Sequence, residues 1–257
     1  MTKFSPLPHP GHHGSDSAPA LAGKCVLIVD DSAACRMVQE AMAKAMGAFV
    51  ETAGTAVQAM VASGNSPFDL IILDIGLADA DGRVLARTLR ETPNGKAAAI
   101  LCVSGLGGQA REDGALDAGA DAFAEKPFAS VAAFGEAAGG AILTRAGLAE
   151  AGSILLDATH TPEEEEALSP YIASCALEDL SRARERLLAA VGKGDVSAAR
   201  RAGHFISGVA SLIGETALDA ASRTLETATG DSGALRSVEA VLGLTFEAET
   251  KLKSVIS

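Results

Sequence analysis

Three acidic side chains stand directly after short apolar segments in the N-terminal half of the chain. Asp30 and Asp31 follow the segment CVLIV, and Asp74 follows DLIIL. The carboxyl ends of parallel strands meet in one crevice, so these carboxylates are expected to lie close together. Crowded carboxylates repel one another, and burial strengthens the repulsion. A divalent cation relieves it, and Mg²⁺ prefers a few carboxylates together with waters or a phosphate.

A hydroxyl group and an ammonium group follow two later apolar segments. Ser104 comes after AAILCV, and Lys126 comes after the short run at 122–124. Serine supplies a hydroxyl donor and lysine a compact positive charge. With the three acids they describe a pocket for a phosphoryl group carried on a carboxylate. Asp74 is the natural nucleophile, because it lies on the middle strand of the expected order 2-1-3-4-5.

The elements that must position these residues alternate between strands and helices. The strands are predicted at 25–29, 48–50, 69–73, 98–103 and 122–124, and the helices at 33–46, 55–63, 82–90, 110–118 and 130–139. Ser32 and Thr55 stand where helix N-caps belong. Continuous apolar strands alternating with helices are typical of a parallel sheet covered on both faces. The sequence therefore predicts an α/β domain with a doubly wound, parallel, five-stranded sheet.

The residues above resemble the receiver domain of two-component response regulators, which implies a flavodoxin-like fold over residues 23–139. The resemblance is carried by VDDS at 29–32, DLIILD at 69–74, DG at 81–82, Ser104 and FAEKPF at 123–128. It implies that Asp74 is the phosphoacceptor. It also implies that Mg²⁺ is held by Asp30, Asp31, Asp74 and the backbone carbonyl of Gly76.

The same resemblance assigns three further roles. Ser104 and Lys126 would contact the phosphoryl group, and Phe123 would be an aromatic switch. The chain departs from the family at two places. Leu77-Ala78 stands where the family often has Met-Pro, and Gly76 offers no side chain over the phosphoryl group. Both departures bear on how fast the acyl phosphate hydrolyses.

Other phosphate chemistries fit these residues less well. Haloacid-dehalogenase-type phosphatases also use an aspartate nucleophile with Mg²⁺, but they need two aspartates spaced by two residues, which the segment DDS at 30–32 does not supply. The glycines in the segment GLGG at 105–108 lack the spacing of nucleotide-binding loops. A metal-dependent phosphatase remains a third reading, and turnover of small phosphate esters would reveal it.

After residue 140 the alternation of strands and helices stops. Residues 140–165 are predicted to be a linker, and residues 166–257 an all-α four-helix bundle with helices at 170–191, 196–213, 215–229 and 234–256. Residues 1–22 are predicted to be a flexible tail. The tail contains His9, His12 and His13, which we expect to bind metal only adventitiously.

His204 is the one histidine inside a predicted regular helix. On a helical projection it shares a polar face with Arg200, Ser207, Gly208 and Ser211, opposite an apolar stripe. The imidazole is therefore expected to point towards solvent. The residues after it are small, so a bulky partner can approach closely. Arg200 adds a positive charge one turn earlier.

The run ARRAGHFISGVASLIG at 199–214 resembles the histidine phosphotransfer (HPt) domain, over roughly residues 153–257. The family pattern is His-x-x-Lys-Gly, so the resemblance implies that His204 is a second phosphoacceptor. Ser207 replaces the lysine that normally lies near the phosphoryl group. The open alternative is an exposed surface histidine on a purely structural bundle.

Composition narrows the classes of function. Hydrophobic residues make up 48% of the 257 residues, which excludes global disorder. The net charge of −12 and the 4% of aromatic residues argue against a nucleic-acid partner. No apolar run is long enough to insert in a membrane, and the first 22 residues lack the apolar core of a secretory signal. Four scattered cysteines predict reduced thiols and a cytoplasmic protein.

These observations lead to one expectation of function and one alternative. The chain is expected to be a phosphorelay protein with Mg²⁺ as cofactor and without a kinase ATP site, hence not itself an enzyme. Asp74 would receive a phosphoryl group from a sensor histidine kinase or phosphotransfer protein, and His204 would exchange one with the receiver of another regulator. The alternative is a signalling adaptor, whose receiver changes conformation while the helices only dock partners.

Overall fold

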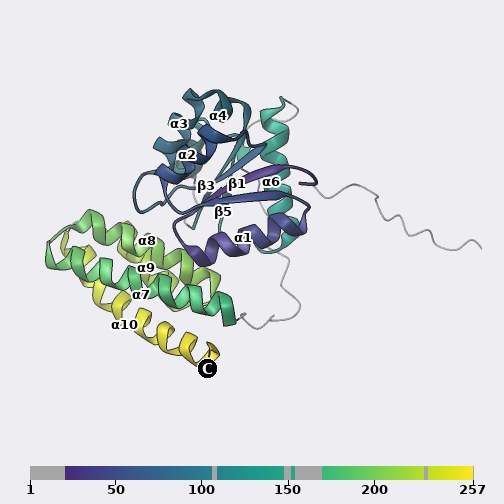
Figure 1. Ribbon diagram of the computed structural model, residues 1–257. Coiled ribbons are helices and arrows are strands. Elements are labelled where there is room, and N and C mark those ends of the chain that lie inside the picture. Colours follow the sequence, from purple (N-terminus) through teal and green to yellow (C-terminus); the bar gives the residue numbers. More distant parts are fainter. Residues whose placement is uncertain (1–20, 106–108, 148–151, 154–169, 229–230, 257) are drawn as a thin grey trace, which may run out of the picture.

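The computed structural model describes residues 21–105, 109–147, 152–153, 170–228 and 231–256. An α/β layer structure and a group of long helices lie against each other, with α1 and α8 at the junction between them (Figure 1). Most of the predicted tail, including its three histidines, and most of the predicted linker lie outside the described residues. Leu21, at the end of that tail, is fully buried in the α/β core.

A six-stranded parallel sheet forms the centre of the N-terminal half. Its strands are β1 (Cys25–Val29), β2 (Phe49–Ala53), β3 (Leu70–Asp74), β4 (Ala99–Ser104), β5 (Ala122–Glu125) and β6 (Gly152–Ser153). The strand order β2-β1-β3-β4-β5-β6 contains the predicted order and adds one strand at the edge. The prediction of five strands was wrong by the two-residue β6, which pairs with β5 and is too short to leave a pattern in the sequence.

Helices cover both faces of the sheet and build the C-terminal half. They are α1 (Ala33–Ala45), α2 (Ala56–Asn65), α3 (Gly82–Glu91), α4 (Pro93–Ala97), α5 (Gln109–Leu116), α6 (Val131–Arg145), α7 (Pro170–Gly192), α8 (Val196–Leu212), α9 (Thr216–Thr227) and α10 (Asp231–Ile256). Ser32 and Thr55 cap α1 and α2 as predicted, each accepting a backbone N–H three residues on. The helix predicted at 130–139 continues to Arg145. The short α4 was not predicted.

Two apolar layers hold the sheet. On one face, α1 and α6 pack Ala43, Phe134 and Ala137 against Val26, Ile28, Leu70 and Leu101. On the other face, α2, α3 and α5 pack against Leu27, Ile71, Leu73 and Phe123. The five residues of β3 are all buried, so Asp74 lies at the end of a fully buried strand.

The described helices α7 to α10 share a third apolar core. Alanine and leucine side chains dominate it, with Leu180, Leu187, Ile206 and Val241 fully buried. Ala34 of α1 belongs to the same cluster, so the core of the helical region continues into the surface of the α/β region. Among the described helices none is both long and apolar enough to cross a membrane.

Phe134 is the side chain whose loss should weaken the α/β core most clearly. It is fully buried and stacks edge-on against Phe128 at 5.1 Å between ring centroids. We expect Phe134→Ala to lower the free energy of unfolding by about 3–5 kcal/mol, because it leaves a cavity. Phe49→Ala is the matched control, since the Phe49 ring is 70% exposed at the sheet edge. Urea unfolding followed by circular dichroism measures both, and equal losses would contradict this account of the core.

Candidate functional site

The predicted site residues of the α/β half meet at the carboxyl edge of the sheet. Asp30 follows β1, Asp74 ends β3, Ser104 ends β4 and Lys126 follows β5. The Lys126 ammonium lies between two of the acids, 2.8 Å from Asp30 Oδ2 and 3.1 Å from Asp74 Oδ2. The parallel topology brings these four residues together from positions nearly 100 residues apart.

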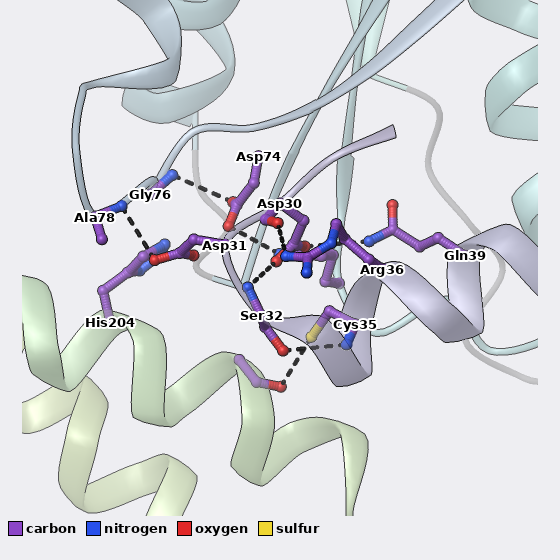
Figure 2. Close-up of polar contacts among 12 residues, drawn as sticks. Asp30, Asp31, Ser32, Cys35, Arg36, Gln39, Asp74, Gly76, Ala78 and His204 are labelled. Atoms are coloured by element: carbon purple, nitrogen blue, oxygen red, sulfur yellow. Dashed lines mark hydrogen bonds and ion pairs between the residues drawn. The ribbon is translucent and has the colours of Figure 1, made fainter. Parts of the chain in front are cut away.

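Local structure around the start of α1 fixes Asp30. Its carboxylate accepts hydrogen bonds from the Ser32 backbone N–H at 2.9 Å and from Gln39 Nε2 at 3.1 Å (Figure 2). Arg36 donates to the backbone carbonyl of Asp30 at 2.5 Å. Asp31 Oδ2 accepts the Ala78 N–H at 3.1 Å, which ties the first acidic loop to the loop after Asp74.

The electrostatics of the site follow from burial and from this one lysine. Burial, together with the neighbouring Asp30 and Asp74 charges, raises the pKa of Asp31 to about 7. Burial also raises the pKa of Asp30. Burial would raise the pKa of Asp74 as well, but Lys126 and His204 hold it below its usual value. Burial opposes the charge of Lys126, yet Asp30 and Asp74 keep its pKa well above the ordinary value.

Three carboxylates in the site could hold a metal ion. Asp30, Asp31 and Asp74 each offer one oxygen, and these oxygens all lie within 4.8 Å of one another. Burial is the main reason for the raised pKa of Asp31, and the neighbouring Asp30 and Asp74 charges add to it. A divalent cation fits this donor set by charge and by ligand type. The Gly76 carbonyl stays a predicted fourth ligand.

Ser104 and Phe123 are both buried. Ser104 is fully buried, and its backbone carbonyl accepts the Lys126 N–H at 2.8 Å, which holds the lysine beside β4. The Phe123 ring is 2% exposed and packs in the core beneath α3 and α5. A switching role for this ring therefore requires repacking of that core, and it stays a prediction.

His204 is not on a free surface, and the prediction that it points to solvent was wrong. Its side chain is 12% exposed, because α8 lies across the acidic pocket of the α/β half and the imidazole points into it (Figure 2). A side chain at Gly76 would overlap with His204 Nε2, so the ring lies directly against the Gly76 backbone. The structure thus brings both predicted phosphoacceptors, Asp74 and His204, into one site.

Glu226 of α9 is a site residue that sequence reasoning missed. Its Oε2 lies 3.3 Å from His204 Nδ1. A carboxylate only accepts hydrogen bonds, so this contact favours a proton on Nδ1, while Nε2 lies on the side of the ring next to Gly76. Burial would lower the pKa of His204, but the Glu226 hydrogen bond and charge raise it above its usual value. In the sequence, Glu226 is only an acidic residue on the helix after His204, and no known spacing connects the two residues.

Two other residues of the predicted polar face behave differently from expectation. Ser207 is fully buried and donates a hydrogen bond to Asp219 of α9, so it faces a neighbouring helix and not solvent. Arg200 donates to the Ala228 carbonyl at 2.7 Å and lines a cavity of about 580 Å³ together with His204, Glu226 and Gly76. The arginine therefore lies near the imidazole, as predicted, but it is held by the end of α9.

Asp179 of α7 makes the main polar contact between the two halves. It is fully buried, and its Oδ2 accepts hydrogen bonds from Ser32 Oγ at 2.9 Å and from the Ala34 N–H at 3.1 Å. The Ala34 N–H belongs to the first turn of α1 and has no partner within its own helix. Arg182 pairs with the other Asp179 oxygen at 2.7 Å. Asp179 thus acts as a cap for α1 that comes from the other half of the chain.

Further contacts surround this cap. Arg186 Nη1 lies 3.9 Å from Asp31 Oδ2, and its guanidinium stacks over the Phe205 ring at 5.6 Å. Cys35 Sγ lies 4.0 Å from the Gly208 carbonyl. The helical region therefore covers the acidic pocket with α8 and holds the start of α1 with α7.

Comparison with known proteins gives the same assignment for the α/β half. The family model for the response regulator receiver domain matches residues 26–134. The chain is 38% identical over 109 residues to a gliding motility regulatory protein of Myxococcus xanthus, covering 42% of this chain and 14% of that protein. It is 36% identical over 103 residues to the KDP operon transcriptional regulatory protein KdpE of Escherichia coli, covering 40% of this chain and 44% of KdpE.

Solved structures with a similar segment include two receiver proteins. The chemotaxis response regulator CheY4 of Vibrio cholerae is 25% identical with a TM-score of 0.42, covering 44% of this chain and 93% of that one. The receiver domain of the Pseudomonas aeruginosa sensor histidine kinase PA1611, solved with a magnesium ion in its active site cleft, is 29% identical with a TM-score of 0.40, covering 43% and 90%. Each of these matches covers less than half of this chain.

The cap supplied by Asp179 should be visible in amide exchange. We expect Asp179→Ala to speed hydrogen exchange of the Ala34 amide by about tenfold or more, because a hydrogen bond to a charged group contributes about 1.5–3 kcal/mol. Glu178→Ala is the matched control, since the neighbouring Glu178 is exposed on the same helix. NMR-detected exchange measures both variants. Unchanged protection of Ala34 in Asp179→Ala would show that the two halves do not dock through this contact.

Proposed function

Starting from a response regulator receiver domain over residues 26–134, we propose that this chain is a phosphorelay protein with two phosphoacceptors. Asp74 receives a phosphoryl group from the phosphohistidine of a sensor kinase or phosphotransfer protein. His204 exchanges a phosphoryl group with a receiver aspartate, and residues 166–257 act as an HPt module. The observation that carries this proposal is the His204 ring facing Asp74, with Nδ1 on Glu226 and Nε2 turned to the pocket.

Asp74 suits the role of acceptor because its surroundings favour the charged form. Lys126 lies 3.1 Å from Oδ2, and the Gly76 N–H donates to Oδ1 at 3.2 Å. A carboxylate kept ionised is the nucleophilic form. Lys126 also offers positive charge to the incoming phosphoryl oxygens, since phosphoryl transfer depends on positioning and charge compensation more than on acid–base steps.

Mg²⁺ completes the site in this proposal. Asp30, Asp31 and Asp74 would hold it, with the Gly76 carbonyl as a further ligand. When bound, the ion neutralises charge on the phosphoryl oxygens during transfer. The donor set consists of hard oxygens, which is the set that Mg²⁺ prefers.

His204 suits the second role because one of its nitrogens is prepared to react. Glu226 keeps the proton on Nδ1, which leaves the Nε2 lone pair free to attack phosphorus. The same carboxylate compensates the positive charge that the ring gains when Nε2 is phosphorylated. Glu226 is thus a positioning residue, which acts through His204.

A signalling adaptor is the second candidate, and one observation favours it. The lysine of the HPt pattern is replaced by Ser207, which is buried against Asp219 and offers no charge to a phosphoryl group. In that reading the helices dock on the receiver without exchanging phosphate. KdpE is a transcriptional regulatory protein by name. The absence of a nucleic-acid partner for this chain, and of an enzymatic activity of its own, stay predictions.

Labelling of variants separates the two candidates. We expect ³²P-acetyl phosphate with Mg²⁺ to place a base-labile label on the wild-type chain and none on Asp74→Asn, because Asp74 is the acyl acceptor. We expect phosphorylated partner receivers to place a base-stable, acid-labile label slowly on Asp74→Asn, because His204 is intact there. His204→Gln should lose only this second label.

The outcomes are distinct. Normal base-labile labelling of Asp74→Asn would contradict the acceptor assignment. If no phosphohistidine forms on any variant with a panel of phosphorylated receivers, the adaptor is the correct function.

Mg²⁺ binding tests the acidic cluster directly. We expect Asp31→Asn to weaken Mg²⁺ affinity, because one of three carboxylate ligands is removed, although relief of repulsion among the acids offsets part of the loss. Asp79→Asn is the control, since Asp79 lies in the next loop and caps the Ala56 N–H. NMR titration of the full chain with Mg²⁺ gives both constants. Equal affinity in Asp31→Asn and wild type would place the ion elsewhere.

A further inference from the structure

We infer that the receiver with which His204 exchanges its phosphoryl group is the receiver of the same chain, and that the paired state shields both acceptors from outside partners. This inference rests on the proposed function and adds the identity of the partner. Two helices hold the closed pairing: α7 binds the start of α1, and α8 covers Asp74. The chain then has a relay within itself that opens to receive and release phosphate.

Residues at the contact between the two halves are buried as in a specific docking surface. Asp179 and Ala34 are fully buried at the junction, and Ala34 packs within the apolar core of the helical region. Burial of the Asp179 charge would be costly without partners, and it has three: Ser32 Oγ, the Ala34 N–H and Arg182. Removing the receiver would leave two of these interactions unmade. The helical surface is therefore complementary to this receiver in both shape and polarity.

Gly76 supplies the specificity for the histidine. An atom at its Cβ position would overlap with His204 Nε2 and Cδ2. Every other amino acid at this position would hold the imidazole away from Asp74. Across the same pocket Gly105 and Gly208 lie close together, with a hypothetical Gly105 Cβ 3.8 Å from Gly208 Cα. Small residues on both sides thus allow α8 to approach the pocket closely.

The closed state has no room for a phosphoryl group. A space of about 10 Å³, close to what one water molecule needs, lies between Asp74, Lys126 and His204. A phosphoryl group with three oxygens requires α8 to move outward. The closed pairing is therefore the unphosphorylated resting state, and phosphorylation of Asp74 loosens it.

The transfer step balances with the groups present. The Nε2 lone pair of His204 forms the bond to phosphorus, and the bond from phosphorus to Asp74 oxygen breaks. Its electron pair returns to the Asp74 carboxylate. Nδ1 keeps its proton, and Glu226 compensates the charge on the ring. The reverse step uses the same groups, so the direction depends on which outside partner removes the phosphate.

The shielding follows from the same geometry. Asp74 is 4% exposed and the His204 side chain 12% exposed. The histidine of an outside kinase would need the position that His204 occupies. A partner receiver would need the face of α8 that lies on this receiver. Each acceptor therefore reaches an outside partner only after the two halves separate.

Dilution of the labelled chain tests the pairing. The full wild-type chain is incubated with ³²P-acetyl phosphate and Mg²⁺, and the label on Asp74 and on His204 is separated by base treatment. We expect phosphohistidine to form at a rate that does not change on dilution. A mixture of Asp74→Asn and His204→Gln chains should form it roughly 100-fold more slowly at about 10 µM, because a linker gives a millimolar effective concentration.

Two pairs of variants connect the rate to the contacts. Asp179→Lys should accelerate the first labelling of Asp74, because the pocket is uncovered, and should make transfer to His204 dependent on dilution. Glu178→Lys, on the exposed face of α7, should behave as wild type. Gly76→Ala should lower the ratio of His204 label to Asp74 label by about tenfold or more, and Gly64→Ala should not, since a Cβ there meets nothing within 4 Å.

The result that overturns the inference differs from the one that overturns the proposed function. If phosphohistidine forms in the wild type at a rate that falls on dilution, transfer occurs between chains and the internal pairing is wrong, while the phosphorelay stands. An unchanged label ratio in Gly76→Ala, together with dilution-independent transfer in Asp179→Lys, leads to the same conclusion. If no phosphohistidine forms in the wild type, in the mixture or with outside receivers, the proposed function itself fails.

Discussion

The site depends on the two ion pairs that the Lys126 ammonium group makes. This group lies between Asp30 and Asp74 at the carboxyl edge of the sheet, where three carboxylates are buried together. One lysine among three acids leaves an excess of negative charge, which adds to the effect of burial in raising the pKa of Asp31. The donor set suits a divalent cation, and the lowered pKa of Asp74 favours its ionised form, as the proposed role of acceptor requires. The sheet topology makes the arrangement possible, because every one of these residues follows a parallel strand.

The same excess of negative charge accounts for the side chains that the helical region brings to the junction. Arg186 approaches Asp31, and His204 lowers the pKa of Asp74. The helices also carry Asp179 to the positive end of α1, where a helix N-terminus favours an anion. Charges of opposite sign thus meet at two points of one surface. Together with the apolar contact of Ala34, they align α8 so that its histidine enters the pocket beside Gly76.

A protein that holds both acceptors in one closed site has to open in order to communicate. The space beside Asp74 and His204 is only about 10 Å³, so under the proposed pairing the closed contact and a phosphorylated Asp74 would exclude each other. In the proposed relay, phosphorylation of Asp74 would separate the halves through local crowding at the junction. The buried Phe123 ring fits this proposal. Moving it would require repacking of the core, whereas separation at the junction moves only the groups that lie there.

The sequence alone determined the α/β fold, the strand ends that carry Asp30, Asp74, Ser104 and Lys126, and the limits of most helices. It could do so because strand periodicity, N-caps such as Ser32 and the rules of parallel topology are local or general. The tertiary structure alone decided that His204 is covered, that Ser207 is buried against Asp219, and that Glu226 and Asp179 belong to the site. A helical projection gives the direction of a side chain relative to its own helix axis. It contains no information on which other surface lies in that direction, and this is why a face that reads as polar and solvent-exposed became the centre of the junction.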